Sequence, residues 1–466
     1  MSNSSTFRGI TLSSIYGKLF DHIVLSRYGE RLLSSELQFG FKARSSTNLC
    51  SMVLKESMAY YVNHQSSVFC TFLDASKAFD RLKYCKLFKL LISRQVPPLI
   101  IRVLINFYTG NFVRVAWCGI VSDYFLAING VKQGGVLSPV LFCLYIDGLL
   151  VALSNAGVGC FIGDYFVGAL AYADDIVLLA PSASALRIML AICDKYANDY
   201  CISFNASKSK CLVVLPRKCR FLSDYVKNCI FYVGNNPIEY VDSFAHLGHV
   251  ITNQLTDNAD ILKRRSDFVG QANNVLCFFS KLSSSIKYRL FHSYCMSLYG
   301  SELWLLSNAQ INDLCVSWRK SLRRIWNLPF NSHCYLIPLL SQCLPLFDEI
   351  CRRSLNFIKV CICNGSSLVR AVTNYGIQYG RHNSLLGHNL LFCAQLFNFS
   401  AQDIASVSVN RLVNNYSFKL VTDYQLQTAS FVRELVLLRE STLELSNRVN
   451  LSRFELDQLV HVVSTS

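Results

Sequence analysis

Two adjacent aspartates, Asp174 and Asp175, lie between two short apolar runs, residues 168–171 and 176–180. Apolar runs of this length around a short polar stretch predict two β-strands joined by a hairpin, with the aspartates at its tip. Neighbouring carboxylates repel each other by roughly 4 kcal/mol at about 4 Å and an effective dielectric near 20, and a divalent cation removes this cost. Mg²⁺ prefers oxygen ligands, so the pair is a candidate metal site. Asp-Asp is also a common turn dipeptide that faces water, and this alternative stays open for the pair alone.

A third carboxylate, Asp74, directly follows another apolar run, residues 68–73. This run is rich in aromatic and β-branched residues, which predicts a buried strand that ends at the aspartate. An amphipathic helix is expected to begin near Phe79 and to end before Pro97 and Pro98. Helix capping would explain a lone aspartate here equally well. Three carboxylates at the ends of neighbouring strands, however, could hold two metal ions about 3.5–4 Å apart, the arrangement that polymerases use.

A glycine-rich loop contributes to the same candidate site. Gln133 and Gly134 stand where the backbone could approach a ligand closely, although an ordinary turn is the alternative.

The segment that follows this loop, residues 136–153, is strongly apolar. Ser138 at the N-cap and Pro139 at the first helical position predict the start of a helix. The segment reaches membrane-spanning length, but Asp147 and Gly148 interrupt it, and we therefore expect a core helix.

Seven motifs follow one another along residues 8–251. They are RGITL (8–12), QFGFKARSSTN (38–48), FLDASKAFD (72–80), NGVKQGGVLSP (129–139), AYADD (171–175), FNASKSKCLVV (204–214) and FAHLGHVI (244–251). In this order they resemble the reverse transcriptase of non-LTR, LINE-type retrotransposons, nearest the jockey-like group. The resemblance implies an α+β fold: a right-hand polymerase palm, in which helices pack on an antiparallel sheet, with partial fingers, a helical thumb and a helical C-terminal region.

The resemblance also implies roles for individual residues. Asp74, Asp174 and Asp175 match the metal-binding aspartates, which implies two Mg²⁺ ions with Mn²⁺ as a substitute. Phe79 matches the bulky residue beneath the sugar of the incoming nucleotide, which excludes ribonucleotides and so implies the use of dNTPs. Lys208 matches a lysine that assists the pyrophosphate leaving group, since an ammonium stabilises developing negative charge. A solvated lysine on a basic loop is the alternative for this position.

Further matches concern the nucleotide, the template and the primer. Arg8 matches an arginine that contacts the triphosphate, and Gln133 and Gly134 match the loop that packs against nucleotide and template. Nucleic-acid contacts are implied at two places. The first is a template-side block, where an aromatic residue can stack and a cation can pair with phosphate; it comprises Gln38, Gly40, Phe41 and Arg44. The second is a primer-grip hairpin with Leu247 and Gly248.

The composition suits a polyanionic partner. Lys and Arg number 45 against 30 for Asp and Glu, a formal charge of +15. One basic cluster beyond the palm lies between Trp318 and Trp326 and comprises Arg319, Lys320, Arg323 and Arg324. It is expected to bind the sugar–phosphate backbone of the template–primer duplex. A solvated helix face is the usual alternative. The expected partners are an RNA template, a DNA primer and dNTPs, with no membrane and no small organic cofactor.

We expect three regions in these 466 residues, of which 52% are hydrophobic. They are fingers and palm over residues 1–252, a helical thumb-like region over 253–344, and a helical C-terminal region of unknown role over 345–466. The clearest helical pattern in the last region covers residues 431–449.

The cysteines predict no special chemistry. There are twenty, without a C-x₂-C pair, and Cys361 and Cys363 are too close together for a usual zinc knuckle, so we do not expect a zinc site. No signal peptide is evident, so we expect reduced thiols inside a cell, in the nucleus and cytoplasm.

Two functions remain open. Proteins of this family usually carry an endonuclease and a longer fingers region, whereas Met1 stands only seven residues before Arg8. We therefore expect an N-terminally truncated copy with its palm chemistry intact and with weak or absent activity. The first function is RNA-directed DNA polymerase, and the alternative is a non-catalytic nucleic-acid-binding remnant of a retroelement.

Overall fold

The computed structural model describes residues 9–76, 78–216, 229–330, 332, 334 and 336–417. The chain forms two compact units. Unit 1 holds the residues up to Leu247 together with Ile251–Leu255 and Asn364–Tyr375, and unit 2 holds Gly248–Val250, Thr256–Cys363 and the described residues from Gly376 onward. These units differ from the three consecutive regions that the sequence predicts, because part of the C-terminal region belongs to unit 1.

Unit 1 is built on a five-stranded sheet. In spatial order its strands are β13 (Glu239–Tyr240), β10 (Lys210–Val214), β1 (Val68–Asp74), β9 (Asp175–Ala180) and β8 (Ala169–Tyr172). The central strand β1 is antiparallel to both of its neighbours, and only the short β13 runs parallel to β10. Every residue of β1 before Asp74 is buried, as its continuous apolar run predicts. The predicted α+β palm with an antiparallel sheet is confirmed.

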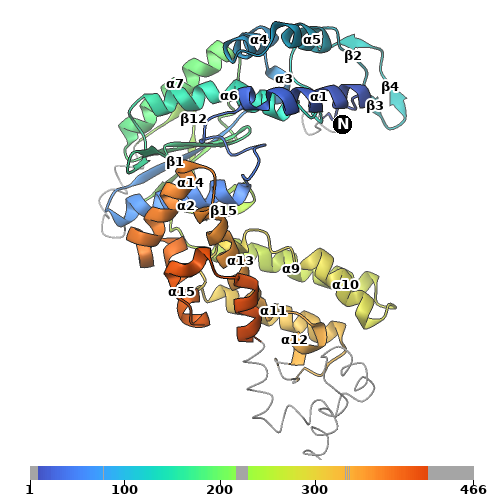
Figure 1. Ribbon diagram of the computed structural model, residues 1–466, viewed down its shortest axis with the longest axis vertical. Coiled ribbons are helices and arrows are strands. Elements are labelled where there is room, and N and C mark those ends of the chain that lie inside the picture. Colours follow the sequence, from blue (N-terminus) through green and yellow to red (C-terminus); the bar gives the residue numbers. More distant parts are fainter. Residues whose placement is uncertain are drawn as a thin grey trace, which may run out of the picture. The chain divides into compact units, whose positions relative to one another are not determined.

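The described part of unit 1 also contains helices. They are α1 (Ile15–Tyr28), the 3₁₀ helix η2 (Gly29–Leu32), α2 (Thr47–Asn63), α3 (Ala78–Arg81), α4 (Tyr84–Ser93), α5 (Pro98–Thr109), α6 (Ser138–Asn155), α7 (Ala183–Tyr200) and α14 (Ser367–Tyr375). Figure 1 shows α6 and α7 on one side of the strands and α2 with α14 on the other. The remaining strands form two-stranded sheets: β2 (Phe112–Val113) with β5 (Phe125–Leu126), β3 (Ala116–Trp117) with β4 (Ile120–Val121), β6 (Phe161–Ile162) with β7 (Tyr165–Phe166), β11 (Tyr232–Val233) with β12 (Asn236–Pro237), and β14 (Ser243–His246) with β15 (His249–Thr252).

The apolar helix α6 lies in the core of unit 1. It is long and apolar enough to cross a membrane, but most of it is buried inside the protein. Its Asp147 is 3% exposed and pairs with Arg94 at 3.1 Å. Ser138 is the first residue of the helix and not its N-cap, which corrects the prediction from sequence. The carboxylate of Asp21 from α1 accepts the N–H of Leu137 at 3.3 Å, so a distant side chain supplies the cap.

The single helix expected to begin near Phe79 is in fact two helices, α3 and α4. Between them, the carbonyl of Leu82 accepts the N–H of Gly130 at 2.8 Å, and the N–H of Lys83 donates to the Tyr145 hydroxyl at 3.4 Å. These tertiary hydrogen bonds replace intrahelical ones and break the helix. Pro98 then begins α5, where proline at the first turn is well tolerated.

Apart from the first residues of β15, unit 2 is helical in the part of it that the structure describes. Its elements are α9 (Asn258–Phe278), α10 (Ser284–Cys295), the 3₁₀ turn η3 (Ser301–Leu303), α11 (Gln310–Ile325), α12 (Leu336–Ser341), α13 (Leu346–Ile362), the π-helical turn η4 (Gly376–Gly380), the 3₁₀ turn η5 (Arg381–Asn383), α15 (Leu385–Phe397) and the 3₁₀ turn η6 (Ala401–Ala405). The helix predicted over residues 431–449 lies outside the described residues.

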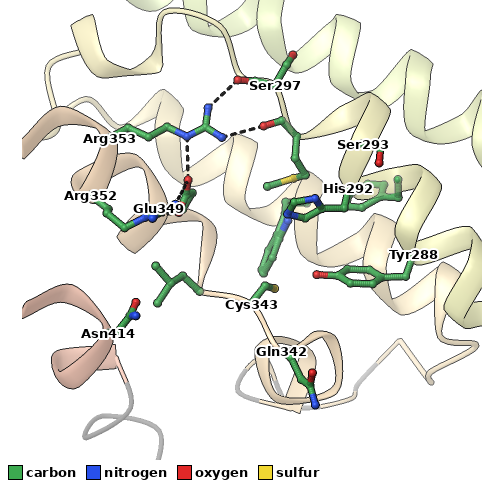
Figure 2. A pocket seen from close by; sticks show the side chains of 14 residues that line it. Tyr288, His292, Ser293, Ser297, Gln342, Cys343, Glu349, Arg352, Arg353 and Asn414 are labelled. Carbon is green, nitrogen blue, oxygen red and sulfur yellow. Dashed lines mark hydrogen bonds and ion pairs between the residues drawn. The ribbon is translucent and has the colours of Figure 1, made fainter. Parts of the chain in front are cut away.

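A cavity of about 470 Å³ lies among the helices of unit 2 (Figure 2). At its edge the guanidinium of Arg353 donates to the Glu349 carboxylate at 2.9 Å and to the carbonyls of Met296 and Ser297 at 2.9 and 2.6 Å. These bonds fix α13 to the end of α10. Throughout the described residues the cysteines are free thiols.

Candidate active site

The predicted metal-binding aspartates lie at one end of the sheet in unit 1. Asp74, the last residue of β1, is the direct cross-strand partner of Asp175, the first residue of β9. Directly opposed residues of an antiparallel pair have Cα atoms about 4.5–5.5 Å apart and side chains on the same face. Asp174 occupies the turn between β8 and β9. Carboxylates that are far apart in the sequence are therefore neighbours in the fold.

This donor set suits a hard divalent cation. Mg²⁺ is usually held by one or two carboxylates, with water and substrate phosphates completing its shell. The Asp74 side chain is 38% exposed, which leaves room for such ligands. Among the described residues no group of three or more His, Cys, Asp or Glu side chains could hold a metal ion by itself. The register thus supports a pair of oxygen donors, and the binding of two Mg²⁺ ions stays a prediction.

The structure brings Lys208 to the same end of the sheet. Its Nζ lies 4.0 Å from Oδ2 of Asp74, although 69% of its side chain is exposed. The loop is shaped by Asn205, whose Oδ1 accepts the Ser207 N–H at 3.0 Å and the Ser207 hydroxyl at 2.7 Å. The backbone of Asp74 is bonded to this loop at two points. Its N–H donates to the Ser209 hydroxyl at 3.1 Å, and its carbonyl accepts the Asn205 N–H at 2.8 Å.

Asn205 and Ser209 were not predicted as site residues. The signal was nevertheless present in the sequence, because an asparagine two residues before a serine favours a turn in which the side chain bonds to its own backbone. That turn positions Lys208 beside Asp74. Lys208 as an aid to the leaving group stays a prediction that this geometry allows.

Phe79 is held rigidly next to the glycine-rich loop. Its ring stacks on Phe142 of α6 with a centroid distance of 4.8 Å and an interplanar angle of 20°. Its carbonyl accepts the N–H of Val131 at 2.8 Å, so α3 and the loop are joined through the backbone. A fixed ring is what a steric barrier to a 2′-hydroxyl would require, and this role also stays a prediction.

The glycine-rich loop contacts the N-terminal segment. The carbonyl of Gln133 accepts the N–H of Thr11 at 2.7 Å. Gly134 has φ +106°, and a Cβ there would lie 3.1 Å from the Thr11 carbonyl oxygen, so glycine permits the close approach. Arg8, predicted to contact the triphosphate, lies outside the described residues.

Gln38 lies against the aspartate turn. It is 1% exposed, and its side-chain oxygen accepts the N–H of Ala173 in the aspartate turn at 2.8 Å. The Gln38 amide therefore faces the aspartate turn and not solvent, and its predicted contact with nucleic acid stays a prediction. Gly40 is also buried, and a Cβ there would lie 2.6 Å from the Ala173 nitrogen. Gly40 therefore permits the close approach of this loop to the turn, and its predicted contact with nucleic acid stays a prediction.

Phe41 and Arg44 remain available for nucleic acid. Phe41 is 52% exposed and Arg44 is exposed, and both have positive φ, at +55° and +59°. Their contacts with a template stay predictions.

The predicted primer-grip residues form a two-residue turn between β14 and β15. Leu247 has φ +47° and Gly248 has φ +84°. Within unit 2, Arg264 donates to the carbonyl of Gly248, and its guanidinium lies 5.2 Å from the ring centre of Tyr299. Contact with a primer stays a prediction for this turn.

The basic cluster on α11 is only partly exposed. Lys320 and Arg324 are exposed, whereas Arg319 is half-buried. Arg323 donates to the carbonyl of Ser332 through Nε at 3.2 Å and through Nη2 at 2.7 Å, so it stabilises a loop of unit 2.

The tryptophans near this cluster do not form an exposed stacking surface. Trp318 is 2% exposed and belongs to the core, and Trp326 donates to the Ser341 hydroxyl at 3.0 Å. The predicted duplex contact therefore depends on Lys320 and Arg324 more than on the other two cations, and it stays a prediction.

Comparison with known proteins agrees with this geometry. A family model described as reverse transcriptase (RNA-dependent DNA polymerase) matches residues 2–251. The chain belongs to the reverse transcriptase family. Its matched region spans the palm sheet, the aspartates and the Lys208 loop, and the resemblance to non-LTR retrotransposon reverse transcriptases is confirmed.

The relatives of this reverse transcriptase chain include retroelement proteins. It is 29% identical over 254 residues to the Pol polyprotein of the type-2 retrotransposable element R2DM of Drosophila melanogaster, covering 52% of this chain and 23% of that protein. It is 24% identical over 354 residues to the RNA-directed DNA polymerase from mobile element jockey of Drosophila funebris, covering 70% of this chain and 36% of that protein. The chain thus spans about a quarter to a third of these relatives' length. Telomerase from Candida tropicalis aligns with a TM-score of 0.36 and 13% identity over 81% of this chain and 58% of that one, which is too low for any inference.

Proposed function

We propose that this protein is an RNA-directed DNA polymerase of a non-LTR retrotransposon, which adds dNTPs to the 3′-hydroxyl of a DNA primer on an RNA template. One observation carries this proposal. Asp74 and Asp175 are direct cross-strand partners, and Nζ of Lys208 lies 4.0 Å from Asp74, inside a region that belongs to the reverse transcriptase family.

The side chains have separable tasks in this reaction. Asp74, Asp174 and Asp175 supply oxygen ligands and concentrate negative charge where a divalent cation is needed. A divalent cation held by these oxygens would supply a Lewis acid, which would make the primer hydroxyl more acidic and neutralise charge on the triphosphate. Lys208 places an ammonium where the pyrophosphate gains charge, and an exposed lysine can move toward that charge. Phe79, fixed by its stack on α6, limits the space beneath the sugar.

An Asp174→Ala variant tests the proposal directly. The loss of one charge-stabilising carboxylate should lower primer extension on an RNA template with Mg²⁺ by at least about 100-fold. Binding of the template–primer, measured by fluorescence anisotropy, should change little. The matched control is Asp164→Ala, because Asp164 also lies in a two-residue hairpin turn, between β6 and β7.

Two outcomes would contradict the proposal. Extension by Asp174→Ala equal to that of the unaltered protein would remove the site assignment. Template binding without extension by the unaltered protein, with either Mg²⁺ or Mn²⁺, would instead support the non-catalytic remnant.

A Phe79→Val variant tests the choice of sugar. A smaller side chain should raise the relative use of rNTPs over dNTPs by about 10-fold or more, the scale expected when a pocket loses bulk. The ratio of kcat/KM for rNTP and dNTP is the measurement, because it does not depend on how much of the protein is active. Unchanged discrimination would show that another residue excludes the 2′-hydroxyl.

A further inference from the structure

A loop with a buried centre, residues 35–44, lies against the aspartate turn, and we call it the support loop. The Gln38 carboxamide makes two hydrogen bonds with the backbone of Ala173. Its oxygen accepts the Ala173 N–H at 2.8 Å, and its nitrogen donates to the Ala173 carbonyl at 3.4 Å. The same oxygen accepts the N–H of Gly40 at 2.9 Å. One side chain therefore satisfies both backbone groups of a residue in the turn.

Two features of Ala173 make its conformation depend on these hydrogen bonds. Its φ is +57°, a left-handed conformation in which the Cβ of an alanine is strained. It is also only 5% exposed, so water cannot replace a missing partner of its N–H or C=O. Because Asp174 and Asp175 follow immediately, any relaxation of Ala173 would move both carboxylates.

The backbone of the support loop reinforces the side-chain contact. The N–H of Phe39 donates to the carbonyl of Ala171 at 2.7 Å, and the N–H of Ala171 donates to the carbonyl of Leu37 at 2.9 Å. Residues 37–39 thus extend the palm sheet beyond its edge strand β8. Gly40 then passes so close to Ala173 that a Cβ would clash with the turn.

The support loop is itself held by a helix from the C-terminal region of the sequence. The Glu36 carboxylate accepts the N–H of Ser367 at 3.0 Å, its hydroxyl at 2.6 Å and the N–H of Leu368 at 2.9 Å. It therefore caps the N-terminus of α14, where unpaired N–H groups and the helix dipole favour an anion. At the other end of the loop, Asn364 donates to the carbonyl of Arg44 at 3.3 Å.

The C-terminal end of α14 packs against helix α2. The ring of Tyr375 packs edge-on against Tyr60 of α2 at a centroid distance of 4.8 Å, and Figure 1 shows α14 beside α2. A contiguous set of contacts therefore runs from α14 through Glu36 and Gln38 to the turn that carries the aspartates.

We propose that Gln38 is a positioning residue of the polymerase site, which holds Ala173 and the two aspartates after it in place, and that α14 keeps Gln38 there through Glu36. The inference rests on the proposed function only for its catalytic consequence. It assigns a role in the polymerase unit to a segment of the C-terminal region, for which the sequence predicted none.

A double-mutant cycle tests the link between Gln38 and Ala173. Gln38→Ala should lower kcat for primer extension by about 10- to 100-fold through misplacement of the aspartates, with KM for dNTP nearly unchanged. Glycine adopts positive φ without strain, so Gln38→Ala should cost several-fold less in an Ala173→Gly background. Equal losses in both backgrounds, or a loss confined to KM, would overturn the role.

Hydrogen exchange provides a measurement that does not require activity. Gln38→Ala should speed exchange of the Ala173 and Gly40 amides, and Glu36→Ala should speed exchange in residues 36–40 and at the start of α14. Glu30→Ala is the control, because Glu30 is an exposed glutamate outside these contacts. If Gln38→Ala does not fold, the exposed Glu36 offers a milder variant. Unchanged exchange around Ala173 in Glu36→Ala would overturn the role of α14.

Failure of this inference can be told apart from failure of the proposed function. If the unaltered protein does not extend a primer but Gln38→Ala and Glu36→Ala still loosen the turn, the polymerase proposal fails and the support role stands. If extension is robust and neither variant changes kcat or exchange, the support role alone fails.

Discussion

The turn between β8 and β9 and the turn between β14 and β15 both join their strands through two residues, yet they keep their shapes by different means. In the second turn both central residues, Leu247 and Gly248, have positive φ, the pattern of a type I′ turn, and glycine takes one of them without strain. In the first turn Ala173 has positive φ at a position that favours glycine. Leu247 has the same kind of strain, but it is only partly buried, whereas Ala173 is 5% exposed and its backbone groups are bonded by Gln38, which lies outside the hairpin.

The partners of the two turns also differ in charge. Gln38 holds Ala173 with a neutral amide, which adds no charge beside Asp174 and Asp175. In unit 2 the cationic Arg264 donates to the carbonyl of Gly248 in the turn. The buried Asp260 accepts the N–H of Val250 in the following strand at 3.0 Å and the indole N–H of Trp304 at 2.8 Å. The turn that carries Asp174 and Asp175 is thus supported by a neutral side chain, whereas charged side chains hold the other turn and the strand that follows it.

Among the variants that compare the two turns, the largest effect should come from Gly40→Ala. The new Cβ would lie 2.6 Å from the backbone nitrogen of Ala173, which cannot move without moving the aspartates. We expect kcat for primer extension to fall by about 100-fold, and the free energy of unfolding to fall by about 1–3 kcal/mol from overpacking. Extension kinetics and urea denaturation measure the two effects.

Gly248→Ala is the matched comparison for that variant. Its Cβ would lie 2.9 Å from Cε1 of Tyr299, and the φ of +84° strains any Cβ at this position. Because this strain lies in the predicted primer-grip turn and not at the aspartates, the change should weaken primer–template binding more than kcat. If Gly40→Ala extends as fast as Gly248→Ala, the two turns do not differ in the way described.

A smaller effect is expected from Asp260→Asn. Asp260 is 4% exposed at its side chain, and an amide cannot accept both hydrogen bonds as strongly as a carboxylate. The free energy of unfolding should fall by about 1–3 kcal/mol, while kcat stays within a few-fold of the unaltered protein. Denaturant unfolding and extension kinetics are the measurements. Asp313→Asn, at a side chain that is 55% exposed, is the control and should change neither.

The smallest effect concerns pH. Burial by itself would raise the pKa of Glu36, but hydrogen bonds from Ser367 and Leu368 outweigh it and hold this pKa below the ordinary value of 4.5. A lowered carboxyl pKa means that the contact contributes stability above pH 4.5 and loses it as the pH falls through the lowered value. Protection of the start of α14 against hydrogen exchange, corrected for intrinsic rates, should therefore be constant from pH 7 to 5 and decline below that.

Two comparisons sharpen the pH prediction. The Glu36→Gln variant should lack the acid-dependent decline at α14. The pKa of Asp260 is also lowered, because its hydrogen bonds with His249, Trp304 and Val250 outweigh the effect of burial. Strand β15, whose Val250 N–H bonds to Asp260, should therefore also lose protection in acid.

Much of the palm could be predicted from local pattern. The apolar runs on either side of Asp174 and before Asp74 are the strands β8, β9 and β1, because a continuous apolar stretch of that length is stable only as a buried strand or helix. The helix near Phe79 was predicted as one element and is two, because hydrogen bonds from Gly130 and to Tyr145 compete with its own. Periodicity alone cannot reveal such partners.

The sequence by itself determined the strands, the aspartates at their ends and the membership of the reverse transcriptase family, because these depend on residue type and order along the chain. Only the tertiary structure decided that Gln38 supports the aspartate turn and that Glu36 caps α14. Each of these contacts joins residues more than a hundred positions apart. Such pairings follow from the packing of whole elements, and no local pattern of hydrophobicity or charge specifies which distant backbone a buried amide will meet.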